Sequence, residues 1–287
     1  LNFISKGLKD SNIIWHLAIS KKHNVLNDSI DESFYNKSTV YDLSGFIAGH
    51  DPYLDCIMRV GPQGLNGLAS HDHDDALSIW VYFNGQDFIV EKGCHSYSLD
   101  KNIRENDIGS LAHNLIQPIN QNRTKSRTGS ILQTAFQAPT AKVWSAKKRG
   151  LGYKLVAELD EQKDKEKIFS FYKRELISCG SKPLILTVVD SWEWCSSNQD
   201  SELRWHFAPK VNVNVSTNSK NSIILSDLQG GIKCELEFSC PKEIILNIDD
   251  YEHSSKYGKV ENGKRVRVLI KSHKECQIQS KFLFRDT

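Results

Sequence analysis

Two histidines and three aspartates occupy the five consecutive positions 71–75, three residues before the apolar run IWVYF. If these positions continue the strand that the run predicts, side chains two residues apart share a face, so His71, His73 and Asp75 point the same way. Two neutral imidazoles on one face are a natural start for a zinc site, which needs a third ligand from elsewhere in the chain. Spacing alone leaves hydrogen-bonded surface histidines as the alternative.

Two residues further along the chain are candidates for that third ligand. Glu91 ends the apolar run DFIVE, and His113 lies in the short apolar stretch LAHNLI. Zinc binds both residue types, through a carboxylate oxygen or an imidazole nitrogen. Either residue would complete the site.

The direction of the Glu91 side chain depends on a hairpin predicted at Asn84–Gly85, a pair typical of two-residue turns. With such a turn, Glu91 lies opposite Ser78, on the face away from the histidines. A three-residue loop with a bulge places it opposite Ile79, on the histidine face. A kink in the chain at 74–76 is another way to bring the groups together. The metal site requires one of these departures from a regular hairpin.

The elements that must position these groups are short strands. From about Thr39 to the C-terminus, runs such as KPLILTVVD, KVNVNVST and KRVRVLIKS alternate with Gly, Asn, Asp and Pro. Many short strands at such spacing are typical of a sandwich or barrel. The alternation in NVNV and RVRV indicates strands with one face in water. We therefore predict an all-β fold, a large antiparallel β-sandwich.

A short helical segment precedes the predicted sandwich. Residues 4–23 carry an apolar stripe at helical spacing, with lysines at its end, and residues 24–38 are rich in Asn, Asp and Ser. We therefore divide the chain into a helix with linker at 1–38 and a β-domain at 39–287. The chain begins with Leu and contains one methionine, so we expect it to be part of a longer product.

The overall charge and the apolar runs exclude some classes of partner. The formal net charge is +2, which gives no indication of nucleic acid as a partner. No apolar run is long enough to span a membrane. The seven cysteines include no CxxC pair. We expect most of them to be small buried residues, with one disulfide at most.

Aromatic residues on the predicted strands favour a packing role. Trp192, Trp194 and Trp205 could stack on sugars, but aromatic side chains on strands usually belong to the core. His206, in the run WHF, is expected on an inner strand.

The stretch from Ala69 to Tyr97 resembles the C-terminal β-sandwich domain of the heparinase II/III-like polysaccharide lyases. Members of that family show a pattern close to H-x-H-x-D-A-L-S-F, an apolar strand, and then L-V-D-x-G-x-Y-x-Y. The first part matches HDHDDALSI from His71, and the second matches VEKGCHSY up to Tyr97.

A third block of the family, R-N-x-x-R-S-x-x-H-N-T, resembles RENDIGSLAHNLI, which keeps Arg104, Ser110, His113 and Asn114. Weaker matches continue downstream, so the resemblance extends from about Asp42 to the C-terminus. The short N-terminal helix would then be the remnant of, or the link to, the α/α toroid that precedes the sandwich in these lyases.

The resemblance implies a metal site and its ligands. His73, Glu91 and His113 match the residues that bind a zinc ion, which has a structural role in the family. Asp75 would orient one of the histidine rings without binding the ion itself. The family has Asp where this chain has Glu91, and the extra methylene moves the carboxylate oxygens by about an ångström or more.

The resemblance also implies an activity. These lyases cleave glycosidic bonds beside a uronic acid by β-elimination, which requires neutralisation of the uronate, a base for the C5 proton and an acid for the leaving oxygen. His71 matches the histidine that faces the substrate, and Tyr97 and Arg104 would line the cleft or support it. The expected partners are an anionic polysaccharide and the helical toroid.

The toroid carries the tyrosine usually given the acid or base role, so the sandwich by itself should be a poor catalyst. A non-catalytic domain that binds a glycan or scaffolds surface-polysaccharide assembly is the alternative, and a metal-free adhesion module is a third possibility. By analogy with glycan-processing relatives, we expect a periplasmic or secreted protein.

Overall fold

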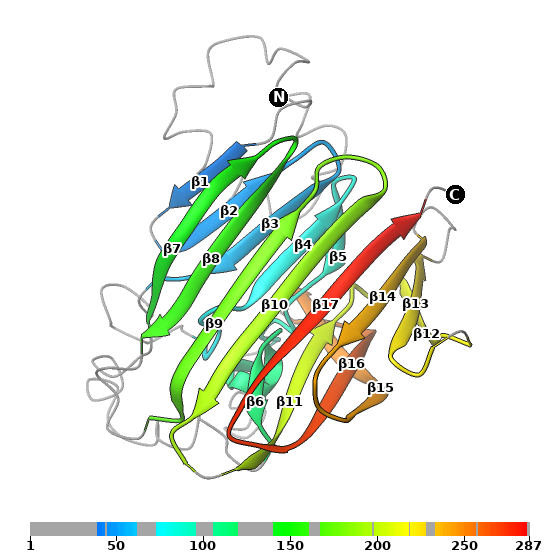
Figure 1. Ribbon diagram of the computed structural model, residues 1–287. Helices are drawn as coiled ribbons and strands as arrows, with labels where there is room; N and C mark the ends of the chain where they lie inside the picture. The colour runs from blue at the N-terminus through cyan, green and yellow to red at the C-terminus, as the bar shows by residue number, and fades with distance from the viewer. Residues whose placement is uncertain are drawn as a thin grey trace.

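The computed structural model describes residues 39–43, 45–61, 73–95, 106–119, 140–160, 167–196, 198–217, 219–227, 233–256 and 258–285. The helix predicted over 4–23 and the linker at 24–38 lie outside these ranges. Within them, the strands form three antiparallel sheets (Figure 1). In these residues no helix is long and apolar enough to cross a membrane.

Hydrogen bonding between neighbouring strands sets the spatial order of the strands in each sheet. The five-stranded sheet consists of β1 (Thr39–Leu43), β2 (Phe46–His50), β3 (Leu54–Arg59), β4 (Ile79–Phe83) and β5 (Gln86–Ile89). The eight-stranded sheet consists of β12 (Val211–Val215), β13 (Ser222–Asp227), β14 (Lys233–Ser239), β17 (Glu275–Arg285), β10 (Leu184–Trp194), β9 (Phe169–Ser178), β8 (Gly152–Asp160) and β7 (Thr140–Arg149). The four-stranded sheet consists of β15 (Ile244–Lys256), β16 (Lys259–His273), β11 (Gln199–His206) and β6 (Ile116–Pro118).

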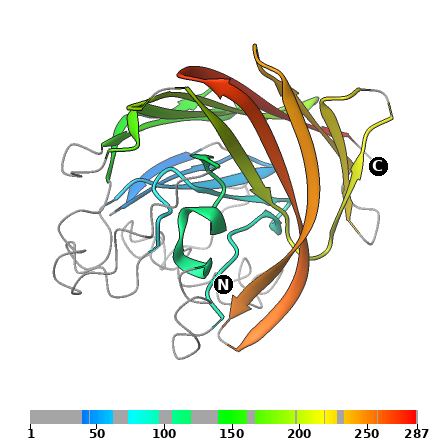
Figure 2. The same ribbon diagram turned by 90° about the horizontal axis from the view of Figure 1, so that it is seen from below.

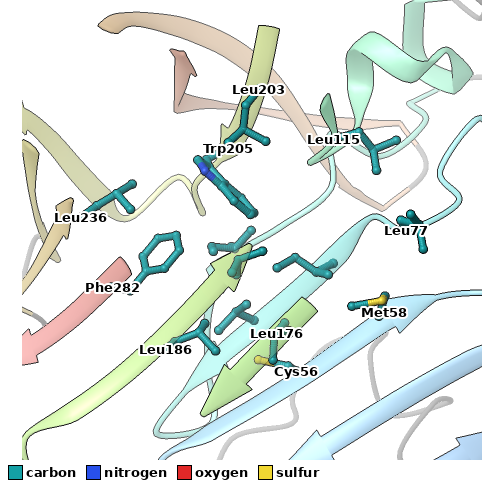
Figure 3. Close-up of a cluster of buried hydrophobic side chains, with 14 of the residues drawn as sticks. Cys56, Met58, Leu77, Leu115, Leu176, Leu186, Leu203, Trp205, Leu236 and Phe282 are labelled. Carbon is teal, nitrogen blue, oxygen red and sulfur yellow. The ribbon is translucent and has the colours of Figure 1, made fainter. Parts of the chain in front are cut away.

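The sheets are stacked as the layers of a sandwich. The eight-stranded sheet covers the five-stranded sheet at one end and the four-stranded sheet at the other (Figures 1 and 2). Buried side chains from all three sheets form one apolar cluster. Figure 3 shows part of it, where Met58 of β3, Leu186 of β10 and Trp205 of β11 lie in one interior. The predicted antiparallel β-sandwich is confirmed.

Strand alternation accounts for the layers. Along β10, buried residues alternate with partly exposed ones from Leu184 to Trp194, so one face packs on the core. Trp192, Trp194 and Trp205 are all buried, as predicted for core residues. His206 is buried at the end of β11, which confirms its expected place on an inner strand.

One ion pair lies inside this apolar interior. Arg174 of β9 and Asp190 of β10 are fully buried, with Nε 2.7 Å from Oδ1 and Nη2 3.0 Å from Oδ2. Tyr172 donates its hydroxyl to the same carboxylate at 2.9 Å. The remaining nitrogen of the guanidinium, Nη1, donates to the carbonyl oxygens of Leu77 and Asn114. Arg174 therefore ties the eight-stranded sheet to two loops that carry candidate site residues.

Replacement of Arg174 by Met should reduce the free energy of unfolding by about 3–5 kcal/mol, because the Asp190 carboxylate would remain buried without its counterion. Denaturant unfolding measures the loss. A second replacement, Asp190→Leu, should restore part of it, because no buried charge is then left. Lys264→Met removes a lysine whose side chain is 45% exposed and whose partner Asp250 is 72% exposed, and it should cost about 1 kcal/mol or less. Equal losses for Arg174→Met and Lys264→Met would contradict this prediction.

Candidate functional site

The three residues predicted to bind zinc lie together in the folded chain. Nδ1 of His113 is hydrogen-bonded to Oε2 of Glu91, and the ring centroids of His73 and His113 are 5.3 Å apart. Glu91 and His113 are both buried. The sequence separates these three residues by up to forty positions, so only the fold brings them together.

The hairpin that positions Glu91 combines a two-residue turn with a bulge. Phe83 pairs with Gln86 across the turn, but Val81 pairs with Ile89, because one extra residue lies in the second strand. The bulge in the strand, rather than a three-residue loop, therefore moves Glu91 by one position relative to a regular hairpin. This is the change of register that the metal site requires.

The chain before β4 is also kinked. Residues 73–78 form bends and turns, Leu77 adopts a left-handed conformation with φ +72°, and β4 begins only at Ile79. The expectation that His73 and Asp75 share the face of a strand is therefore wrong. The carbonyl of Leu77 accepts a hydrogen bond from Nη1 of Arg174, which stabilises the kink.

Asn114 fills the space where β4 and the chain after β5 separate. Its Nδ2 donates to the carbonyl oxygens of Ile79 at 3.0 Å and Val90 at 2.9 Å and so bridges the two segments. Nδ2 also lies 3.1 Å from Oε1 of Glu91. On the other side of the amide, Oδ1 accepts from the backbone N–H of His206 at 2.8 Å. Asn114 thus connects three segments and directs the Glu91 carboxylate.

Ser78 contributes a second support for Glu91. Its hydroxyl donates to Oε1 of Glu91 and accepts from the backbone N–H of Asn114 at 3.0 Å. Oε1 is therefore occupied by neutral donors, which leaves Oε2 for His113. The positions of Ser78 and Asn114 in the family pattern were visible in the sequence, but their role as supports was not, because it depends on contacts across 36 residues.

The environment of His113 favours its charged form. Burial disfavours protonation, but the nearby Glu91 carboxylate outweighs it and raises the pKa of His113 to about 9. The charge of Asp75 acts in the same direction, and Asp75 itself lies 3.6 Å from Nε of Arg59. Asp75 therefore acts on His113 through its charge and forms an ion pair with an arginine.

His206 has the opposite character. Burial lowers its pKa well below the ordinary value, so the ring is neutral. Its Nδ1 lies 3.2 Å from Oδ1 of Asn114, an atom that can only accept, so Nδ1 carries the proton. His206 therefore serves as a neutral donor to Asn114.

The segment after Glu91 is fixed by a second buried carboxylate. Asp107 accepts from Nζ of Lys92 at 2.5 Å and lies 2.8 Å from Nδ1 of His95. The backbone N–H of Ser254 donates to the carbonyl of Lys92 at 2.8 Å. Gly93, which follows Lys92 in the chain, has φ +75°. A Cβ at this position would lie 2.1 Å from the carbonyl oxygen of Ser254. The segment therefore requires glycine at position 93.

Three residues singled out in the sequence, His71, Tyr97 and Arg104, lie outside the described residues. Their roles remain predictions. The structure places His73, Asp75, Glu91 and His113, the other predicted site residues, around one buried region.

The donor set fits a zinc site in its chemistry. Two imidazoles and one carboxylate lie in close proximity, and Nε2 of His113 is 3.4 Å from the carbonyl oxygen of Ile108, the kind of contact that orients a metal-binding histidine whose other nitrogen faces the ion. Glu91 and His113 are bonded to each other as the chain stands. Within the described ranges, no three histidine, cysteine or carboxylate side chains already have a metal-binding geometry.

Comparison of the sequence with known families gives a match over most of the chain. The sequence model of the family described as "Heparinase II/III-like, C-terminal" matches residues 37–281. No curated protein matches the chain.

Solved structures with a similar fold include several lyases. A heparinase III gene product is 15% identical, with a TM-score of 0.68 over 97% of this chain and 40% of its own. The heparan sulfate lyase HepC from Pedobacter heparinus is 16% identical, with a TM-score of 0.67 over 88% of this chain and 37% of its own. This chain thus spans about two fifths of the length of these proteins, and at this identity the likeness concerns the fold.

The stability of the metal-free protein should depend on pH through His113. Its pKa is about 9 in the folded chain and 6.5 in the unfolded one. The stabilisation is therefore fully present below about pH 6.5 and is lost as pH rises through about 9, with a total on the order of 3 kcal/mol. Denaturant unfolding at several pH values in the presence of a chelator measures it. His113→Asn should flatten this dependence, and an unchanged slope in that variant would contradict the assignment.

Gly93→Ala should destabilise the protein more than Gly258→Ala. Both glycines have φ +75°, so the backbone strain of an alanine is the same, but the Cβ at Gly258 meets nothing within 4 Å. The clash with Ser254 should add about 1–3 kcal/mol to the loss at position 93. Urea unfolding of the two variants measures the difference. Similar losses would show that the close approach of Ser254 is not a constraint.

Proposed function

Because the chain belongs to the heparinase II/III-like, C-terminal family, we propose that it is the β-sandwich part of a polysaccharide lyase that cleaves uronate-containing glycans by β-elimination. The observation that carries the proposal is the contact of Glu91 with His113 beside His73. These three residues match the metal ligands of the family pattern, with Glu91 in place of aspartate. In the folded chain they lie side by side.

The proposed zinc ligands are His73, Glu91 and His113. When bound, the ion would have a structural role and would hold together the three segments that bear these residues. Ser78 and Asn114 orient the Glu91 carboxylate, and the additional methylene of glutamate is accommodated because Oε1 is bonded to these two residues while Oε2 reaches His113.

The reaction sets the requirements for the remaining residues. Removal of the C5 proton leaves negative charge on the uronate, so a cationic or hydrogen-bonding group must lie against that carboxylate. We assign this role to His71, two residues before the ligand His73. A rigid attachment of His73 then fixes the backbone that carries His71, which limits the positions its imidazole can take.

The substrate class follows from the chemistry and from the relatives. One of them is named a heparan sulfate lyase, and heparan sulfate is an anionic polysaccharide with uronate units. Since the chain spans about two fifths of such proteins, a helical toroid would supply the other wall of the cleft. We also propose a periplasmic or secreted location, where such polymers occur.

The experiment uses the complete protein with a panel of uronate-containing glycans. Lyase activity should appear as new ultraviolet absorbance from the unsaturated product. His71→Ala should lower kcat by about 100-fold or more. The matched control is His50→Ala, a histidine of β2 that is bonded to Asp55 and is outside the predicted site; it should leave kcat unchanged.

Metal analysis of the same preparations tests whether the protein binds zinc. The unaltered protein should contain about one zinc per chain, and His113→Asn should lose it. Glycan binding without turnover would instead support a non-catalytic domain that binds or scaffolds polysaccharide. The proposed function would be refuted if the complete protein neither cleaves nor binds any glycan of the panel and His71→Ala changes neither result.

A further inference from the structure

Two cysteines that the proposed function does not involve lie next to each other. The Sγ atoms of Cys240 and Cys276 are 3.6 Å apart. Cys240 directly follows β14, and Cys276 is the second residue of β17, the neighbour of β14 in the eight-stranded sheet. Both side chains are partly buried and pack against the edge of the apolar core.

The separation of the two sulfur atoms is suited to bond formation. A disulfide needs an S–S distance of about 2.05 Å and two side chains directed at each other. The two sulfurs must therefore approach by about 1.5 Å to form the bond. Cys56 and Cys234, by contrast, are fully enclosed in the core.

The pair also contains a reactive sulfur. The hydrogen bond from Cys276 stabilises the thiolate of Cys240 and outweighs the opposing effect of burial, so the pKa of Cys240 is lowered to about 7. Lys242 acts in the same direction as the hydrogen bond. A large share of Cys240 is then a thiolate at neutral pH, and the thiolate is the nucleophile in disulfide exchange.

The chain between the two cysteines is the β15–β16 hairpin. The cysteines are 36 positions apart and flank Ile244–His273, so they mark the base of this hairpin (Figure 1). A bond between them would close the hairpin into a covalent loop attached to the eight-stranded sheet.

The same hairpin contacts the candidate site. Nδ1 of His253 lies 3.1 Å from the carbonyl oxygen of Glu91, and Ser254 donates to the carbonyl of Lys92. The backbone N–H of Gly258 donates to the carbonyl of His95 at 3.1 Å. These three contacts come from the turn end of the hairpin, opposite its base, and run along the segment that begins with a predicted zinc ligand.

We propose that Cys240 and Cys276 form a reversible disulfide that closes the base of the β15–β16 hairpin. The bond restricts detachment of the hairpin from the eight-stranded sheet and so favours the contacts that its turn end makes with segment 91–95. The Cys240 thiolate attacks a small-molecule disulfide such as oxidised glutathione and releases one thiolate, which takes up a proton. Cys276 then loses its proton and attacks the sulfur of Cys240 in the mixed disulfide, releasing the second thiol. Two protein thiols and one small disulfide become one protein disulfide and two small thiols.

Two cysteines packed at the edge of a core could instead have only a structural role, as small apolar side chains. The two alternatives differ in their chemistry. A packing role predicts that both thiols stay reduced in an oxidising buffer, whereas the proposal predicts their joint loss.

The experiment equilibrates the unaltered protein in reduced and oxidised glutathione, blocks the remaining thiols with iodoacetamide and maps the peptides by mass spectrometry. The expected result is a linked Cys240–Cys276 peptide in oxidising buffer, which dithiothreitol removes. Carbamidomethyl groups on both cysteines in oxidising buffer would overturn the proposal.

Measurements of thermal stability and of amide hydrogen exchange test whether the disulfide stabilises the protein and segment 91–95. Closure of a loop of this length should raise Tm by about 5–10 °C relative to the reduced protein, and amide hydrogen exchange in segment 91–95 should slow. Cys240→Ser should abolish both differences. The matched control Cys195→Ser, at an exposed cysteine, should retain them. A linked peptide without slower exchange would refute the stabilisation of segment 91–95, and this outcome is independent of lyase activity.

Discussion

The arrangement of the site depends on the buried ion pair between Arg174 and Asp190. A guanidinium inside an apolar core must find an acceptor for each of its nitrogens, because an unpaired buried charge is very costly. The Asp190 carboxylate accepts from two of the nitrogens of Arg174, and the third donates to the carbonyls of Leu77 and Asn114. The requirement for these bonds fixes two loops relative to the central sheet, and these loops bear the residues that support and contact Glu91.

From those two loops, a series of hydrogen-bonded polar groups leads to Glu91. Ser78 follows Leu77 and donates to Glu91, and the Asn114 amide donates to the carbonyls of both Ile79 and Val90. The bulge in the hairpin turns the Glu91 side chain toward these donors. Each support is buried and satisfied, so the carboxylate has one well-defined position, which is what a metal ligand or a structural ion pair requires.

Glu91 stands where the resemblance to the family pattern predicts aspartate, and its surroundings accommodate the longer side chain. A longer carboxylate could have removed the contact with His113, but Ser78 and Asn114 bond one oxygen and leave the other against the imidazole. The charge of the Glu91 carboxylate outweighs the effect of burial, so the pKa of His113 is higher than that of an exposed histidine. The β15–β16 hairpin completes the surroundings by bonding to the backbone of segment 91–95.

The sequence alone determined the all-β sandwich, because strand periodicity and turn residues are local properties. It also identified His73, Glu91 and His113 as candidate zinc ligands, through spacing and a family pattern. It could not decide whether these residues meet. That outcome depends on a one-residue bulge, the left-handed Leu77 and the contacts of Asn114 and Arg174, which join segments up to 97 residues apart. Only tertiary structure decides such features, because the free energy that selects them comes from satisfying polar groups in a shared interior.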